Sequence, residues 1–260
     1  MGIRLALCQS KASVNEVGTN LNKIMSVISQ NRSDMYVFPE LFLTGYGADY
    51  ASLRDEVEYA VDKIKLWCIE MDVAIVLGSP SYGTDGTRNS LLFITPDGVT
   101  RYDKLYLARF GIYGEDGFIP GRKPETASFR DMVFGLSICY DAFFPEIYRN
   151  YALSGADAAL CIAASATPSR PYYDRILPAR SLENVMYTVF VNNIGDFEGD
   201  ARLYGHSRLV GPLGNTITEL GDEEETVCVY LDKDVIGNAR KERRHLDDLR
   251  KDIRWTPGIF

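Results

Sequence analysis

The stretch GLSICYDAFFPE, from Gly135 to Glu146, decides how this chain is interpreted, because it places a cysteine directly after a short apolar run. The preceding residues MVFGLSI predict a buried strand that ends at Cys139. Residues Pro145 to Ser154 predict a helix, since proline is tolerated in a first turn. Cysteines are most often inert core thiols, so the other motifs of the chain must indicate whether Cys139 is reactive.

Composition narrows the class of protein. The 260 residues include 28 Lys and Arg against 36 Asp and Glu, a net charge of -8, and 46% are hydrophobic. This predicts a globular protein with a sizeable core, and it disfavours nucleic acid and anionic membranes as partners.

The N-terminal sequence and the spacing of the cysteines indicate the cellular compartment and whether a metal site is expected. The opening MGIRLALCQS is too short an apolar run for a secretory signal, and other apolar runs stay below the roughly 18 residues of a membrane span. The five cysteines form no CxxC pair, which argues against a disulfide framework and a zinc site. We therefore expect a cytoplasmic protein with reduced cysteines, no metal and no cofactor.

Hydrophobic periodicity predicts alternating strands and helices. Upstream of the cysteine, the pattern gives a strand (3–8), a helix (21–28), a short strand (35–39), a helix (53–67), a strand (73–80) and a hairpin over NSLLFITPDGVTRYDKLYL. Downstream, it gives a strand (156–165), a helix (173–184), a strand (187–193), short strands near 205–210, 216–220 and 226–231, and a helix near 234–244. Two successive β-α runs predict two sheets, each covered on one side by helices. The expected fold is α/β, a four-layer α-β-β-α sandwich forming one domain over residues 1–260.

Three ionisable residues follow predicted strands. Glu40 comes after MYVFP, Lys104 after VTRYD and Cys139 after VFGLSI. Taken singly, a glutamate or a lysine is usually a solvated surface charge. Strand ends in α/β folds, however, are where loops gather reactive groups, so the shared placement of these residues weakens the surface-charge interpretation without reversing it.

These motifs resemble those of the nitrilase superfamily, the carbon-nitrogen hydrolases, over essentially the whole chain. VFPELFLTGY is similar to the glutamate motif, RYDKLYL to the lysine motif and GLSICYDAFFPE to the cysteine motif. ARSLEN, VNNIG and GHSRLVGPLG resemble blocks that the family carries downstream. The resemblance implies the α-β-β-α sandwich and a homodimer or higher homo-oligomer.

The resemblance also implies a catalytic triad of Glu40, Lys104 and Cys139. Glu40 would be the general base, Lys104 the oxyanion stabiliser and Cys139 the nucleophile that forms a thioester. The Lys104 cation and the helix near Pro145 are expected to favour the thiolate. Glu115 aligns with a second glutamate that positions substrate or water.

The substrate is expected to be a small neutral amide. The CYD form of the cysteine motif resembles amidase-like branches of the family, and Phe143 stands where many of those members carry an arginine. Tyr46, Phe110, Tyr113 and Tyr140 add aromatic surface near the predicted site, whereas Arg170 is a candidate for binding an anion.

Other functions stay open. The same triad could hydrolyse a nitrile or an N-carbamoyl amine, which the released product would distinguish. A non-catalytic binding or scaffold relative is the alternative from another class, although such a protein would be expected to lack a triad member. His206 and His245, the two histidines of the chain, receive no role.

Overall fold

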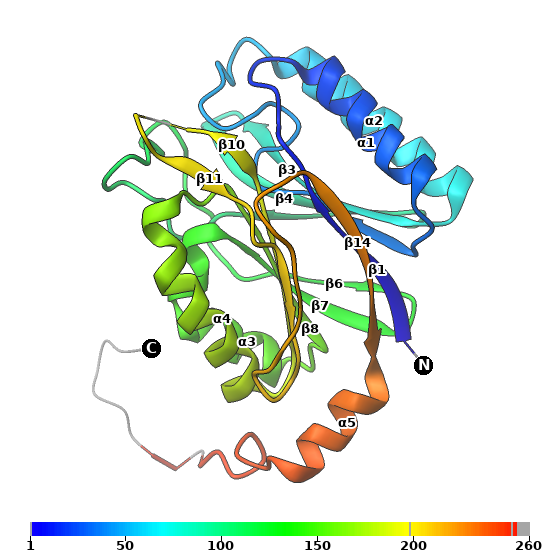
Figure 1. The fold of residues 1–260 in the computed structure, drawn as a ribbon, viewed down its shortest axis with the longest axis vertical. Helices are drawn as coiled ribbons and strands as arrows, with labels where there is room; N and C mark the ends of the chain where they lie inside the picture. The colour runs from blue at the N-terminus through cyan, green and yellow to red at the C-terminus, as the bar shows by residue number, and fades with distance from the viewer. Residues whose placement is uncertain (1, 198, 251, 254–260) are drawn as a thin grey trace.

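Two six-stranded sheets pack face to face in the computed structural model, which describes residues 2–197, 199–250 and 252–253 (Figure 1). The first sheet, in spatial order, contains β14 (Glu225–Asp232), β1 (Gly2–Gln9), β2 (Met35–Val37), β3 (Ala74–Gly83), β4 (Gly86–Thr95) and β5 (Gly98–Asp103). The second contains β13 (Thr216–Glu219), β12 (Arg208–Val210), β9 (Tyr187–Asn192), β8 (Ala158–Ala163), β7 (Met132–Ile138) and β6 (Thr126–Phe129). A separate ribbon pairs β10 (Ile194–Asp196) with β11 (Arg202–Tyr204).

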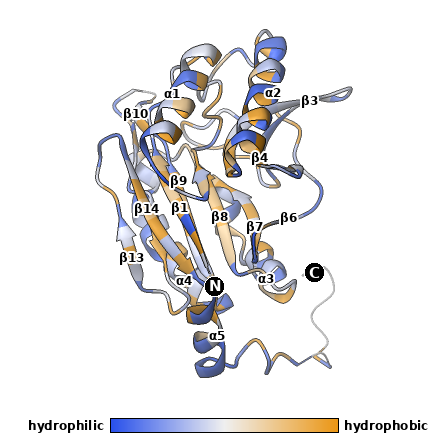
Figure 2. Ribbon diagram, turned by 90° about the vertical axis from the view of Figure 1, so that its right-hand side faces the viewer, coloured by the Kyte–Doolittle hydropathy of each residue, from blue (hydrophilic) through white to orange (hydrophobic). Residues whose placement is uncertain are grey.

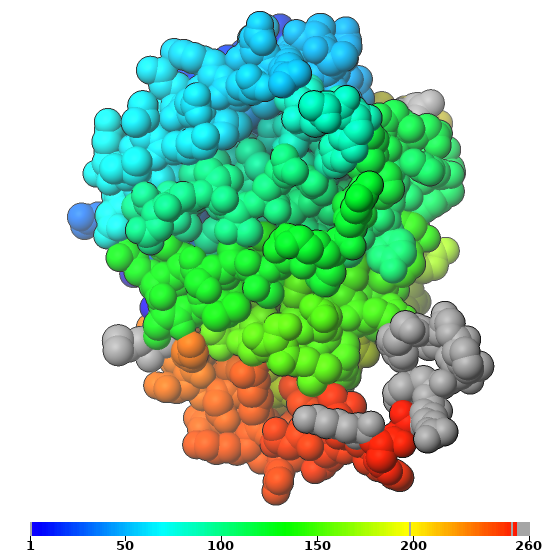
Figure 3. Space-filling model, turned by 180° about the vertical axis from the view of Figure 1, so that it is seen from behind, coloured from blue at the N-terminus to red at the C-terminus, as the bar shows by residue number. Residues whose placement is uncertain are grey.

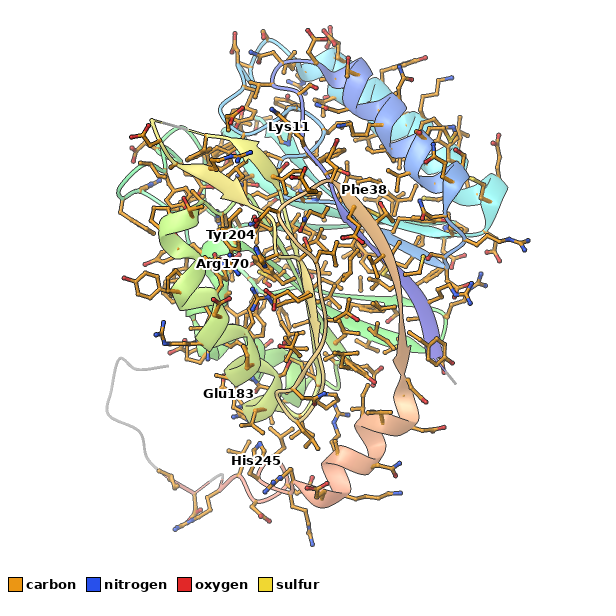
Figure 4. All side chains as sticks on the ribbon, viewed as in Figure 1. Lys11, Phe38, Arg170, Glu183, Tyr204 and His245 are labelled. Atoms are coloured by element: carbon orange, nitrogen blue, oxygen red, sulfur yellow. The ribbon has the colours of Figure 1, made fainter. Side chains whose placement is uncertain are left out.

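Helices cover the outer face of each sheet. The first sheet carries α1 (Val17–Gln30) and α2 (Arg54–Met71), and the second carries α3 (Pro145–Leu153) and α4 (Arg170–Asn184). The last helix, α5 (Lys233–Glu242), lies at the end of the molecule opposite α1 and α2 (Figures 1 and 3). Beyond it, a ring nitrogen of His245 lies 3.0 Å from the Glu183 carbonyl oxygen at the end of α4 (Figure 4). The layers confirm the expected α-β-β-α sandwich.

Strand alternation explains the two cores. In β1, Leu5 and Leu7 face the opposite sheet, whereas Ala6 and Cys8 face α1 and α2. Both faces of this strand are therefore buried, as expected for strands covered by helices on one side and a sheet on the other. The strands accordingly carry mainly apolar residues, and the outward helix faces carry polar ones (Figure 2).

Parallel pairing fixes where the loops emerge. Strands β1, β2 and β3 run parallel in one sheet, and β7, β8 and β9 run parallel in the other. Each parallel step is connected by one of the four helices α1 to α4, so the carboxyl ends of successive strands lie at the same sheet edge. Glu40, three residues beyond β2, and Cys139, directly after β7, both follow such ends.

Local differences from the expected elements have physical causes. The strand expected near 205–210 begins only at Arg208, because Gly205 and His206 have φ values of +67° and +51°, outside the extended region. Strands β6, β10 and β11 were not predicted, because they are three or four residues long and leave little periodicity to detect. None of the helices in the described part of the chain is long and apolar enough to cross a membrane. The single-domain organisation stays a prediction.

Candidate active site

Two carboxylates share one ammonium group in the loops that follow β2 and β5. Lys104 Nζ lies 2.8 Å from Glu40 Oε1 and 2.8 Å from Glu115 Oε1. Lys104 is 1% exposed and both glutamates are fully buried. The usual solvated environment of Glu and Lys therefore does not apply here, and the three groups form one buried ion cluster that includes the predicted Glu115.

Neutral donors complete this cluster. Asn89 Nδ2 on β4 donates to Glu40 Oε1 at 2.7 Å and to Glu115 Oε1 at 2.9 Å. The backbone N–H of Ala164, just past β8, donates to Glu40 Oε2 at 2.7 Å, and that of Ala108 donates to Glu115 Oε2 at 2.6 Å. These bonds fix both carboxylates and satisfy charges that burial would otherwise penalise.

A glycine allows the Glu40 loop to cross β3. A Cβ atom on Gly78 would lie 2.1 Å from the Leu41 backbone nitrogen and 2.5 Å from Glu40 Cα. Leu41 itself has a φ of +48°, a strained value for a residue with a side chain. The backbone is thus pressed against β3 at the point where it aims Glu40 at Lys104.

The electrostatics suit acid-base chemistry. Burial raises the pKa of Glu40, and the neighbouring Glu115 carboxylate raises it further, while Lys104 opposes both effects. Burial lowers the pKa of Lys104, but the two carboxylates outweigh it and hold that pKa well above its ordinary value. The result is a permanent cation beside a carboxylate whose proton affinity is increased, which a general base working near neutral pH requires.

Cys139 lies at the junction between β7 and a short 3₁₀ helix, Cys139–Phe143. Its φ of +48° is unusual for a non-glycine residue and occurs where the strand turns sharply into the helix. Its Sγ lies 3.3 Å from the Tyr173 hydroxyl, and the residue is 4% exposed. Strain at this position is consistent with a side chain held for chemistry.

The expected preference for thiolate needs correction. Burial raises the pKa of Cys139 well above its ordinary value, and the Glu40 charge adds to this effect. Lys104 and Tyr173 act in the opposite direction and do not compensate. The resting sulfur is therefore a thiol, and a base has to remove its proton when it reacts.

An apolar cavity of about 270 Å³ opens onto Cys139. Its wall is formed by the cysteine together with Ala108, Phe110, Tyr113, Tyr140, Phe143, Ser169, Tyr172 and Tyr173. The predicted residues Tyr113, Tyr140 and Phe143 are thus brought together around the sulfur. Within the described part of the chain, no charged side chain lines this cavity.

Tyr46 and Arg170 do not line this cavity. The Tyr46 hydroxyl is buried and has no hydrogen-bond partner among the described residues, and its ring packs against Phe197 at 5.5 Å. Arg170, at the start of α4, is half-exposed, and its Nε lies 4.0 Å from Asp174 (Figure 4).

Asp141 ties the cysteine loop to the lysine loop. Its carboxylate accepts hydrogen bonds from the Ile138 backbone N–H at 3.0 Å, the Tyr106 backbone N–H at 2.9 Å and the Tyr102 hydroxyl at 2.7 Å. Burial raises the pKa of Asp141 to about 6. The aspartate of the CYD motif therefore has a structural explanation, because it holds the backbone beside Cys139 and Lys104.

Two polar side chains of the site, Asn89 and Tyr173, were not predicted. Asn89 could have been noticed as an amide next to the apolar run of β4, whereas nothing local distinguishes Tyr173 from the other tyrosines. His206 lies away from the cavity, with ring nitrogens 2.8 Å from Glu219 and 2.7 Å from Asp222. Across the described residues, no group of three or more His, Cys, Asp or Glu side chains could hold a metal ion.

Comparisons with known proteins identify the family of this chain. The Carbon-nitrogen hydrolase family profile matches residues 4–241. An (R)-stereoselective amidase from Pseudomonas sp. is 29% identical, covering 95% of this chain and 92% of its own. A nitrilase from Pyrococcus abyssi is 31% identical, covering 97% of both chains.

A solved structure adds a chemical observation about a relative. An amidase from Nesterenkonia sp. is 28% identical, with a TM-score of 0.79 over 95% of this chain and 96% of its own. A glutamate-to-glutamine mutant of that amidase shows covalent addition of the acetamide moiety of fluoroacetamide at its active-site cysteine. In that protein, the cysteine is the group that becomes attached to a small amide.

Proposed function

Because this chain belongs to the carbon-nitrogen hydrolases, enzymes with an active-site cysteine, we propose that it hydrolyses small neutral amides to a carboxylic acid and ammonia. The observation that carries the proposal is the position of Cys139, which opens onto an uncharged cavity beside a buried cluster of Glu40, Lys104 and Glu115.

In the first half-reaction, Cys139 attacks the amide carbon and its thiol proton passes to Glu40. The raised pKa of Glu40 supports this transfer, because a stronger base matches the thiol better. The oxyanion that forms is stabilised by the Lys104 ammonium group and by the backbone N–H of Tyr140, at the start of the 3₁₀ helix. Glu40 then returns the proton to the leaving nitrogen as the carbon-nitrogen bond breaks.

In the second half-reaction, water attacks the thioester and releases the acid. Glu40 accepts a proton from the water, the sulfur leaves as the thiolate, and Glu40 returns that proton to the sulfur. Glu115 keeps Lys104 in place throughout, because its carboxylate oxygen holds the ammonium group at 2.8 Å. Glu40 therefore serves as the base in both half-reactions, and Glu115 positions the Lys104 ammonium group.

The preference for a neutral substrate follows from the cavity wall. A substrate carboxylate would be desolvated against Phe143 and the neighbouring rings without a cationic partner in that wall. Arg170 is not among the residues that line the cavity, and its Nε lies 4.0 Å from Asp174.

Relatives with related chemistry favour amides but include a nitrilase. The Pseudomonas and Nesterenkonia proteins are amidases, and the Pyrococcus protein is a nitrilase. A panel of aliphatic and aromatic amides, nitriles and N-carbamoyl amines, assayed for ammonia, acid and carbon dioxide, tests the choice. Hydrolysis of amides, lost in Cys139→Ala, is expected; turnover confined to nitriles or carbamoyl amines would overturn it.

The charge preference has its own test. We expect kcat/KM for an uncharged amide to exceed that for a matched amide with a distal carboxylate, and Phe143→Arg to narrow or reverse the difference. Arginine offers a planar pair of donors to a carboxylate, which a phenyl ring cannot replace. A wild-type preference for the charged amide would refute this part of the proposal.

A further inference from the structure

The hydroxyl of Tyr173 faces the reacting sulfur from α4, a helix outside the three motifs that supply Glu40, Lys104 and Cys139. Its oxygen lies 3.3 Å from Cys139 Sγ, and the residue is 1% exposed. While the sulfur is a thiol, either atom can be the donor. Once the sulfur is a thiolate, only the hydroxyl can donate, and a hydrogen bond to a charged acceptor is stronger than one between neutral groups.

We propose that Tyr173 assists the nucleophile by donating a hydrogen bond to the Cys139 sulfur as the thiolate forms. This inference rests on the proposed role of Cys139. The thiol proton passes to Glu40, negative charge collects on the sulfur, and the Tyr173 hydroxyl stabilises it. As the sulfur-carbon bond forms, that charge moves to the amide oxygen and the hydrogen bond from Tyr173 weakens. This hydrogen bond therefore stabilises the thiolate more than it stabilises the thiol or the thioester.

Packing holds Tyr173 in this position. Its ring meets Phe143 edge-on, with centroids 5.4 Å apart, and lies 5.1 Å from the Phe190 ring on β9. The next residue, Asp174, accepts a hydrogen bond at 2.8 Å from Arg208 on β12, whose side chain is 3% exposed. The start of α4 is therefore anchored to the second sheet, and the hydroxyl is oriented before substrate arrives.

The need for such a donor follows from the surroundings of the sulfur. Burial and the Glu40 charge both oppose the thiolate, and Lys104 is already shared by two carboxylates. The Tyr173 hydroxyl is the neutral donor in contact with the sulfur among the described residues, and it adds no charge to the cavity. It stabilises the nucleophile without creating an anion-binding site.

Alkylation kinetics test the inference without requiring amide turnover. The rate of Cys139 alkylation by iodoacetamide is measured against pH by peptide mass spectrometry, with the exposed Cys228 of the same digest as internal reference. In Tyr173→Phe, the pH midpoint for Cys139 should rise by about one unit, and kcat for an amide should fall about tenfold with KM little changed.

A matched control separates this effect from general loosening. Tyr151→Phe removes an equally buried hydroxyl, whose acceptor is the Leu136 carbonyl oxygen, and should leave the Cys139 midpoint unchanged. An unchanged midpoint in Tyr173→Phe, or the same shift in Tyr151→Phe, would overturn the inference. If the wild-type protein hydrolysed no amide, the proposed function would fail, whereas the alkylation midpoints would still decide the role of Tyr173.

Discussion

Replacing Lys104 with methionine should destabilise the protein as well as inactivate it. The substitution keeps the side-chain length but removes the cation that lies 2.8 Å from both Glu40 and Glu115, which are fully buried. Removing one partner of a buried ion pair typically costs about 3–5 kcal/mol. In a chain of this size, each kcal/mol lowers the melting temperature by about 2–4 °C, so a fall of roughly 6–20 °C is expected.

The loss of stability in Lys104→Met should depend on pH in a defined direction. Without Lys104, the pKa of Glu40 rises further in the folded state, because the cation opposed the effect of burial on this carboxyl group. An acid whose folded pKa is raised contributes stability below its unfolded pKa and loses that contribution as pH rises through the folded pKa. Lys104→Met should therefore approach wild-type stability near pH 4 and fall behind as pH rises.

Urea denaturation at several pH values measures this effect. The control is Lys65→Met, which removes a half-exposed lysine 2.9 Å from Asp62 and should cost at most about 1 kcal/mol. A second variant, Lys104→Met with Glu115→Gln, should recover part of the stability because one unpaired charge is removed. If Lys104→Met were no less stable than Lys65→Met at neutral pH, the conclusion that Lys104 neutralises two buried carboxylates would be wrong.

Three further predictions follow from individual groups. Glu115→Gln removes a like charge that raises the pKa of Glu40, so the acidic limb of the kcat/KM profile should move to lower pH; a limb that stays or rises would contradict this. The pKa of Asp141 is about 6 in the folded protein, whereas its ordinary value is 3.8. The free energy of unfolding of the wild type should therefore fall by roughly 3 kcal/mol as pH rises from 4 past 6, and denaturation curves of Asp141→Asn should lack this decrease. Asp232 caps α5 through the Asp234 N–H at 2.9 Å, so Asp232→Ala should cost about 1 kcal/mol, whereas Asp232→Asn should cost less.

The convergence of the proposed triad was predictable because it depends on strand order and strand ends. Apolar runs showed where β2, β5 and β7 end. Parallel pairing in the first sheet sets the end of β2, parallel pairing in the second sheet sets the end of β7, and β5 is an edge strand that pairs antiparallel with β4. Glu40, Lys104 and Cys139 could therefore be selected from the sequence, and the family motifs supplied the roles now proposed for them.

The environment of these residues was not predictable in the same way. The ion cluster around Lys104 depends on Asn89 and on backbone groups of Ala108 and Ala164, which lie far from one another in the sequence. The resting thiol at Cys139 results from burial, which no local pattern encodes. Arg170 was a candidate for binding an anion, and its place outside the cavity lining, 4.0 Å from Asp174, depends on the orientation of α4, which the local sequence does not encode.

The most direct test of the account is to look for the acyl group on the enzyme. The protein is mixed with a small neutral amide, quenched in acid within milliseconds to seconds, digested and analysed by mass spectrometry. We expect an acyl thioester on Cys139 that forms and decays at rates compatible with turnover, and that is absent from Cys139→Ala. Steady hydrolysis with no adduct on Cys139, or hydrolysis at the wild-type rate by Cys139→Ala, would contradict it.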